Sequence, residues 1–235
     1  TKRVQIGTSI TVLTYRHPLL LAKLFSTVDQ LSDGRIIAGV GIGSFQEEFQ
    51  ALQTPYKTRG KMANETLEIM KQAWTTQGAL NFSGDYWQFQ NTQFEPRPIQ
   101  KPHPPIYVAG NSKAAIRRAV EFGEAYHPGI ASPSEIRTIL DNMKEECEAY
   151  GRDPETLKLS LISGLKLMTS PYESSHIVGT EDEASKRLDA LQELGVDSVV
   201  FHTFTYTTEV KKENEDSIMK SISTFAKNIM PKFQN

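Results

Sequence analysis

The chain has 235 residues, of which 38% are hydrophobic and 23% are charged, and its formal net charge at pH 7 is -2. This composition is typical of a globular protein with a sizeable core, and the near-neutral charge without a basic cluster argues against nucleic acid or membrane lipid as a partner. The single cysteine, Cys147, excludes a disulfide framework and fits a reducing, cytoplasmic compartment, and no apolar run reaches the roughly 18 residues of a membrane span.

Predicted strands and helices alternate from end to end. The strands are short and apolar on both faces, as in RIIAGVG, which is typical of strands covered on both sides. This alternation predicts right-handed βαβ units, a parallel sheet and a single α/β domain over residues 1–235. In chain order we expect strand 4–10, helix 18–31, strand 35–40, helix 59–74, strand 106–108, helix 113–122, a weak strand 125–127, helix 133–150, strand 159–168, helix 181–194, strand 198–204 and helix 216–229.

An aromatic segment interrupts this order between residues 74 and 104. A Ser-Gly-Asp turn at residues 83–85 lies between alternating aromatic residues, which predicts a β-hairpin inserted in a loop. The aromatic side chains either line a substrate opening or, as is more frequent, cover one end of the fold. They are Phe82, Tyr86, Trp87, Phe89 and Phe94.

About six β/α units can be counted. A closed (β/α)8 barrel takes about 250 residues, so it would need two further units before Thr1, whereas an open doubly wound sheet needs none. The pattern alone leaves both architectures open. Because the sequence begins without methionine and almost without a lead-in to its first strand, we interpret it as a fragment or a processed chain.

A strand turns sharply into a helix within PPIYVAGNSKAAIRRAVEFG, at the turn formed by residues 110–113. Two later helices start with capping boxes, whose carboxylates are Glu135 and Glu183, but this helix starts with Lys113 and no acidic residue. Its positive end and its glycine predict a binding turn for an anion, foremost a phosphate. An ordinary Asn or Ser cap on a solvated helix explains the turn equally well.

A second glycine-rich turn, GVGIGSFQEEF, follows the strand at residues 35–40. Its glycines, Gly39, Gly41 and Gly43, alternate, so they match neither a dinucleotide fingerprint nor a P-loop. Alternating glycines at a strand end indicate that a flat group packs against the backbone.

Among the histidines, His127 is the best candidate for an acid or base, because it ends a strand where barrel enzymes place their sites. His17 precedes Pro18 and is expected to cap a helix, whereas Arg16 beside it could reach a substrate or cofactor oxygen. His202 lies in an apolar run and fits a core position. The spacings indicate no metal site and no nucleophile triad.

Four short motifs, YRHP, LSDGR, GVGIG and EEF, follow one another, and longer stretches such as FEPRPIQKPHPPIYVAGNSK and VGTEDEASKRLDALQELGVDSVVF accompany them. Together they resemble the bacterial luciferase-like superfamily of flavin- and deazaflavin-dependent oxidoreductases. The resemblance covers most of the chain. It implies a TIM (β/α)8 barrel of the luciferase-like type, here truncated to about six β/α units with an inserted hairpin, beginning at the third strand.

The resemblance also implies which residues bind the cofactor. A non-prolyl cis peptide at Thr8-Ser9 would lie under the flavin ring, and the turn at residues 110–113 would hold the phosphate. The chain departs from many relatives at Ala125 and Tyr126, where they have Gly and Trp, and from some at Ser44, where they have Arg. The implied cofactor residues are Thr8, Ser9, Gly41, Gly43, Ser44, Gly110, Asn111, Ser112 and Lys113.

The implied activity is coenzyme F-420-dependent hydride transfer to or from a small organic substrate. The first alternative is an FMN-dependent monooxygenase that uses reduced FMN and oxygen, with a separate flavin reductase as partner. The second is a non-catalytic flavin-binding protein. The family implies a homodimer, and it often takes the residue that protonates the substrate from the first two units; His127 and Arg16 are the catalytic candidates within this chain.

Overall fold

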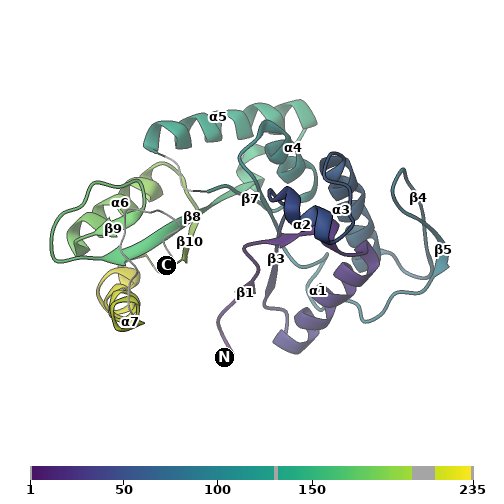
Figure 1. Ribbon diagram of the computed structural model, residues 1–235, viewed down its shortest axis with the longest axis horizontal. Helices are drawn as coiled ribbons and strands as arrows, with labels where there is room; N and C mark the ends of the chain where they lie inside the picture. Colours follow the sequence, from purple (N-terminus) through teal and green to yellow (C-terminus); the bar gives the residue numbers. More distant parts are fainter. Residues whose placement is uncertain (1, 130–131, 203–214, 234–235) are drawn as a thin grey trace. The chain divides into compact units, whose positions relative to one another are not determined.

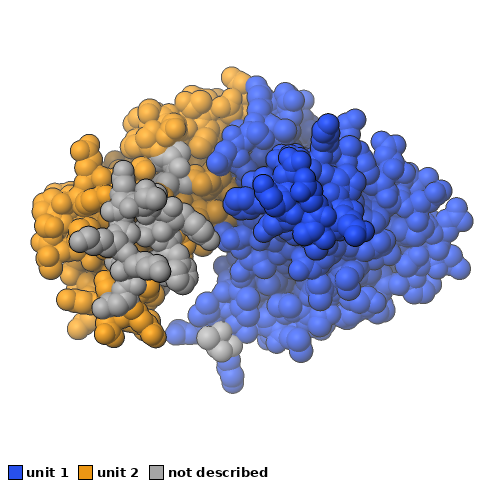
Figure 2. Space-filling view, viewed as in Figure 1, with its two compact units in different colours: residues 1–126, 146–157 blue, residues 127–145, 158–235 orange. Residues whose placement is uncertain are grey.

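The computed structural model describes residues 2–129, 132–202 and 215–233, which divide into two compact units (Figure 2). Unit 1 comprises residues 1–126 and 146–157, and unit 2 comprises residues 127–145 and 158–235. Each contains parallel strands flanked by helices, which confirms the α/β class. The single barrel domain stays a prediction. Among the described residues, no helix combines the length and the apolar character that a membrane crossing requires.

Unit 1 is built on strand β3 (Ile36–Gly41), which pairs in parallel with two short strands on one side and with β6 (Ile106–Ala109) on the other. Its core consists of apolar side chains from these strands packed against the helices α1 (Pro18–Ser32) and α3 (Arg59–Thr75). The indole N–H of Trp74 on α3 donates to the carbonyl of Ala22 on α1. Its other elements include β1 (Ile6–Gly7), β2 (Thr11–Val12), α2 (Gln46–Ala51), α4 (Lys113–Phe122) and β7 (Ala125–His127), whose last residue belongs to unit 2 (Figure 1).

The single strand predicted over residues 4–10 is wrong, because a bulge divides it into β1 and β2. Gly7 pairs with Ile37 and Thr11 with Val40, so three residues on one side face two on the other. The bulge presses the Thr8 carbonyl oxygen against Gly39, where an added Cβ would lie 1.6 Å from that oxygen. Gly39 is therefore required by the chain's own backbone.

The predicted hairpin is confirmed as β4 (Leu80–Ser83) and β5 (Gln88–Thr92), which pair antiparallel (Figure 1). Its turn is bound to α3, since the Glu65 carboxylate accepts hydrogen bonds from the backbone N–H groups of residues 85–87 at 2.8, 3.0 and 3.2 Å. The Trp87 ring meets the His17 ring edge-on with centroids 4.7 Å apart, and Phe94 is buried. Within unit 1 the hairpin therefore covers α3 and the start of α1.

In unit 2, strand β8 (Lys158–Leu167) pairs in parallel with β9 (Ile177–Gly179) and β10 (Ser198–His202). The capping box of Thr180 and Glu183 is present at the start of α6, as predicted. The last two residues of the predicted strand 198–204 lie outside the described residues. The other elements are α5 (Pro133–Tyr150), which contributes to both units, α6 (Glu181–Glu193), α7 (Glu215–Thr224), a π-helical turn (Phe225–Ile229) and a 3-10 turn (Met230–Phe233).

Candidate functional site

The two glycine-rich turns of unit 1 lie side by side at the carboxyl edge of its sheet. Val40 of β3 is in register with Val108 of β6, so the turns that follow these strands are neighbours. A Cβ placed on Gly41 would lie 3.8 Å from the Cβ of Ala109, which confirms this proximity. In parallel sheets, ligands bind at this edge.

The turn at residues 110–113 has the conformation of a tight strand-to-helix connection. Gly110 has φ +139°, and an added Cβ there would lie 2.8 Å from the Cβ of Ala115. The Ser112 hydroxyl caps α4 by accepting from the Ala115 N–H at 3.2 Å. The Tyr126 hydroxyl donates to the Gly110 carbonyl at 2.6 Å, and burial raises the pKa of Tyr126 to about 12, so it stays a donor.

The sequence pattern indicated that Lys113 adds an unpaired cation to this turn. In the structure Lys113 is paired with an acidic residue. Its ammonium lies 3.4 Å from the Glu146 carboxylate, which also binds the Arg117 guanidinium at 2.9 Å. The side chain is therefore neutralised by α5, and a contact between Lys113 and a cofactor phosphate stays a prediction.

Arg59, which the sequence analysis missed, brings a guanidinium to the other turn. Its Nε donates to the Gly43 carbonyl at 3.2 Å, and its Nη1 donates to the Tyr56 carbonyl at 3.0 Å. The guanidinium stacks on the Tyr56 ring at 3.9 Å, and the Tyr56 hydroxyl donates to the Ser44 carbonyl. The available signal was an arginine at the start of the predicted helix 59–74, which pointed to no partner.

The donor set at these turns fits a phosphate group. Neither α3 nor α4 has an acidic residue in its first turn, so the positive ends of these two helices are uncompensated, whereas the short α2 directly after β3 has Glu47 and Glu48 in its first turn. The Thr58 hydroxyl, at the start of α3, is buried and has no hydrogen-bond partner among the described residues. Together with Arg59 it offers donors of the kind that bind anions.

The glycines at the end of β3 and in the turn after it are explained by packing within the chain. A Cβ on Gly41 would lie 2.8 Å from the Ile10 side chain, and one on Gly43 would lie 2.9 Å from the Phe49 ring. The alternation therefore does not by itself indicate a flat ligand. Contacts of Gly41, Gly43 and Ser44 with a cofactor stay predictions.

The non-prolyl cis peptide lies one bond later than the resemblance implies, at Ser9–Ile10 instead of Thr8–Ser9. The Thr8 hydroxyl donates to the Gly39 carbonyl at 2.6 Å, which holds Thr8 against β3. The cis peptide follows within the bulge. Thr8 and Arg16 both line a cavity of about 330 Å³ between the strands and α1. His17 caps α1 as predicted, since its Nδ1 accepts from the Leu19 N–H.

His127, the acid-base candidate, belongs to unit 2 and is 2% exposed. Its Nδ1 lies 3.0 Å from the Ser160 hydroxyl and 3.1 Å from the Ser160 carbonyl. Burial lowers the pKa of His127, and the backbone hydrogen bond offsets this in part. These contacts hold the imidazole in place; its catalytic role stays a prediction.

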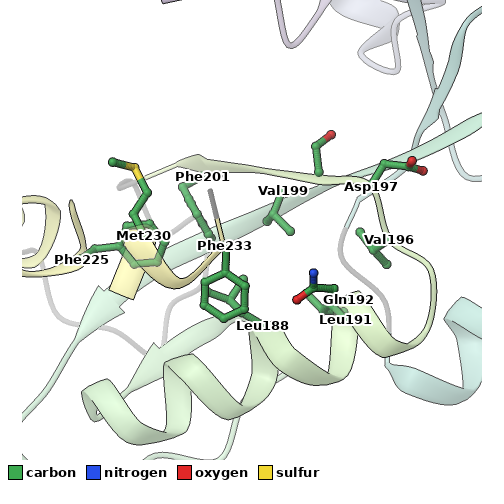
Figure 3. Close-up of a pocket in the computed structure, with 11 residues that line it drawn as sticks. Leu188, Leu191, Gln192, Val196, Asp197, Val199, Phe201, Phe225, Met230 and Phe233 are labelled. Carbon is green, nitrogen blue, oxygen red and sulfur yellow. The ribbon is translucent and has the colours of Figure 1, made fainter. Parts of the chain in front are cut away.

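A second cavity, of about 400 Å³, lies in unit 2 between α6 and β10. Figure 3 shows Phe225 and Phe233 near Leu188 at one end of it, and Asp197 at the other. None of the predicted site residues lines this cavity.

Residues 1–170 match the family model described as luciferase-like monooxygenase. The chain belongs to the luciferase-like monooxygenase family. This confirms the resemblance found in the motifs, and it places both glycine-rich turns of unit 1 within the matched part.

Relatives within the luciferase-like family use two kinds of cofactor. The chain is 33% identical over 137 residues to an FMNH(2)-dependent dimethylsulfone monooxygenase of Pseudomonas putida, covering 57% of this chain and 38% of that one. It is 32% identical over 161 residues to an F-420-dependent glucose-6-phosphate dehydrogenase of Amycolatopsis mediterranei, covering 66% and 47%. The matches therefore span less than half of either relative.

A solved structure confirms the fold class. The monooxygenase RslO1 of Streptomyces bottropensis aligns with a TM-score of 0.84 and 20% identity, covering 100% of this chain and 80% of that one. At this identity the likeness shows the α/β fold of the luciferase-like barrel type, and it says nothing about the reaction.

Proposed function

We propose that this chain binds FMN or coenzyme F-420 as part of a luciferase-like oxidoreductase, with the cofactor phosphate at the two neighbouring turns of unit 1. The observation that carries the proposal is the proximity of Ala109, directly before the Gly110 turn, to Gly41, with Arg59 at the turn after β3. Both cofactors combine a tricyclic ring with a phosphate, so either presents an anion to these donors.

The bound cofactor supplies the hydride or oxygen chemistry, and the protein supplies binding and orientation. The N–H groups that open α4 and the Arg59 guanidinium would hold the phosphate. The Tyr126 hydroxyl fixes the Gly110 carbonyl and with it the direction of the turn. We also propose His127 and Arg16 as residues that act on the substrate, and replacing either by alanine should then lower turnover more than cofactor affinity.

The reaction type proposed first is hydride transfer between coenzyme F-420 and a small organic substrate. The relative from Amycolatopsis supports it, because its match covers more of this chain than the match from Pseudomonas. The second candidate is an FMN-dependent monooxygenase, which the FMNH(2)-dependent relative supports. That activity would need a flavin reductase partner as the source of reduced FMN.

A pair of titrations tests the cofactor proposal. FMN is compared with riboflavin, which lacks the phosphate, and coenzyme F-420 with its phosphate-free deazaflavin chromophore, by fluorescence and absorbance. We expect the phosphate form of one pair to bind at least about tenfold more tightly, since charge-assisted hydrogen bonds contribute about 1.5–3 kcal/mol. Equal binding of both members of each pair would overturn the proposal, and preference for one cofactor would decide the reaction type.

Further expectations accompany this proposal. The protein would act on a small molecule in the cytoplasm as a homodimer. A non-catalytic flavin-binding protein is the alternative: it would show the same phosphate preference but no change in the redox state of the bound cofactor when candidate substrates, or oxygen with reduced FMN, are added.

A further inference from the structure

Arg118 is a buried cation beside the phosphate-binding turns. It lies on α4, five residues after Lys113, and is 5% exposed. Its guanidinium points to α3 instead of solvent: Nε donates to the Asn64 side-chain oxygen at 2.7 Å, and Nη2 donates to the Gly60 carbonyl at 3.0 Å. One side chain therefore connects α4, which starts at the Gly110 turn, with α3, whose first residue Arg59 contacts the turn after β3.

The charge of Arg118 has no carboxylate within 4 Å in the part of the chain that the structure describes. Burial lowers the pKa of Arg118, and the charge of Glu121 counteracts this only in part. A guanidinium nevertheless stays protonated in proteins, so a positive charge is buried next to the positive end of α3. Such an arrangement is costly unless an anion balances it.

The contact with Gly60 gives Arg118 a direct route to the binding turns. Gly60 follows Arg59 in the first turn of α3, and Arg59 donates to the Gly43 carbonyl. By holding the Gly60 carbonyl, Arg118 therefore also holds the neighbouring backbone of Arg59, from which the guanidinium reaches the turn after β3. Asn64 lies one helical turn further on, so the contact with it prevents α3 from rotating about that point.

We propose that Arg118 is a positioning residue for phosphate binding: it holds the first turn of α3 against α4, so that Arg59 and the Gly110 turn contact one anion together. This rests on the proposed function, because it assigns a role within the same phosphate site. Arg118 acts on the anion through α3 and Arg59.

A double-mutant cycle between Arg118→Gln and Arg59→Gln tests this, with the affinity ratio of FMN to riboflavin, or of the F-420 pair, as the readout. We expect each single variant to lower the ratio about fivefold or more, and the double variant to lower it little further, since residues that act together are not additive. Riboflavin affinity itself should change less than twofold.

The neighbouring residue provides a matched control. Arg117→Gln removes the same charge from the same helix, but the Arg117 side chain is 64% exposed and binds Glu146. We expect this variant to keep the wild-type affinity ratio. If Arg118→Gln does not fold, Asn64→Ala weakens the same contact from its other side and should lower the ratio in the same way.

The outcomes separate the two proposals. A wild-type protein without phosphate preference overturns the proposed function and this inference with it. A wild-type preference that survives Arg118→Gln, or effects of Arg118→Gln and Arg59→Gln that simply multiply, overturns this inference alone. Equal loss of FMN and riboflavin affinity would also overturn it, because that is the result of a structural role.

Discussion

Replacing Tyr126 by phenylalanine removes one hydrogen bond from the Gly110 turn and little else. The residue is 1% exposed, and its hydroxyl donates to the Gly110 carbonyl at 2.6 Å. The loss of a buried hydrogen bond costs about 1 kcal/mol, and an acceptor left unsatisfied raises this to about 3 kcal/mol. If about 1 kcal/mol of that cost weakens the binding of FMN, the FMN affinity of Tyr126→Phe falls about fivefold.

Two measurements check this prediction. Thermal unfolding should show a melting temperature about 2–4 °C lower per kcal/mol lost, and flavin titration should show a greater loss for FMN than for riboflavin. Tyr150→Phe is the control, because Tyr150 is an exposed tyrosine on α5. Since the pKa of Tyr126 is about 12, its hydroxyl should not titrate below about pH 10. Wild-type melting and wild-type FMN affinity in Tyr126→Phe would refute the role of the hydroxyl.

Three further predictions concern the bulge, the second turn and pH. Gly39→Ala should destabilise the protein by about 3 kcal/mol or more, because its Cβ would meet the Thr8 carbonyl oxygen; a wild-type denaturation midpoint would contradict this. Arg59→Gln should reduce the preference for FMN over riboflavin in fluorescence titrations, whereas Lys57→Gln, an exposed residue nearby, should not. Burial lowers the pKa of His127, so the unfolded chain takes up protons first as the pH falls below about 6.5 and stability declines. In urea unfolding, the free energy of unfolding should fall less between pH 7.5 and 5.5 for His127→Gln than for the wild type. An equal fall in both proteins would contradict the assignment of this pH dependence to His127.

Local signals in the sequence sufficed for most of the elements. The helix starting at Lys113 is encoded by residues within a few positions of one another, namely Gly110, the Ser112 cap and the apolar spacing that follows. The bulge is different, since residues 4–10 have the pattern of one continuous strand. Only the register against β3 reveals the extra residue.

The candidate site was predicted only where its residues are neighbours in the sequence. The Gly110 turn was found because its glycine and cap are neighbours in the sequence. The contact of Arg59 with Gly43 spans 16 positions, and the ion pair of Lys113 with Glu146 spans 33, so neither follows from periodicity or spacing. Short elements were also missed: α2 has six residues and β9 has three, which is too few for a period to be recognised.

The binding of the hairpin turn by Glu65 has a consequence for the order of folding. A two-stranded hairpin is at most marginally stable alone, and three backbone N–H groups in the turn of this one donate to a carboxylate on α3. The hairpin can therefore persist only after α3 has formed, although it follows α3 in the chain. Trp87 then reaches His17 at the start of α1, so the earliest helix of unit 1 is completed by one of its later segments.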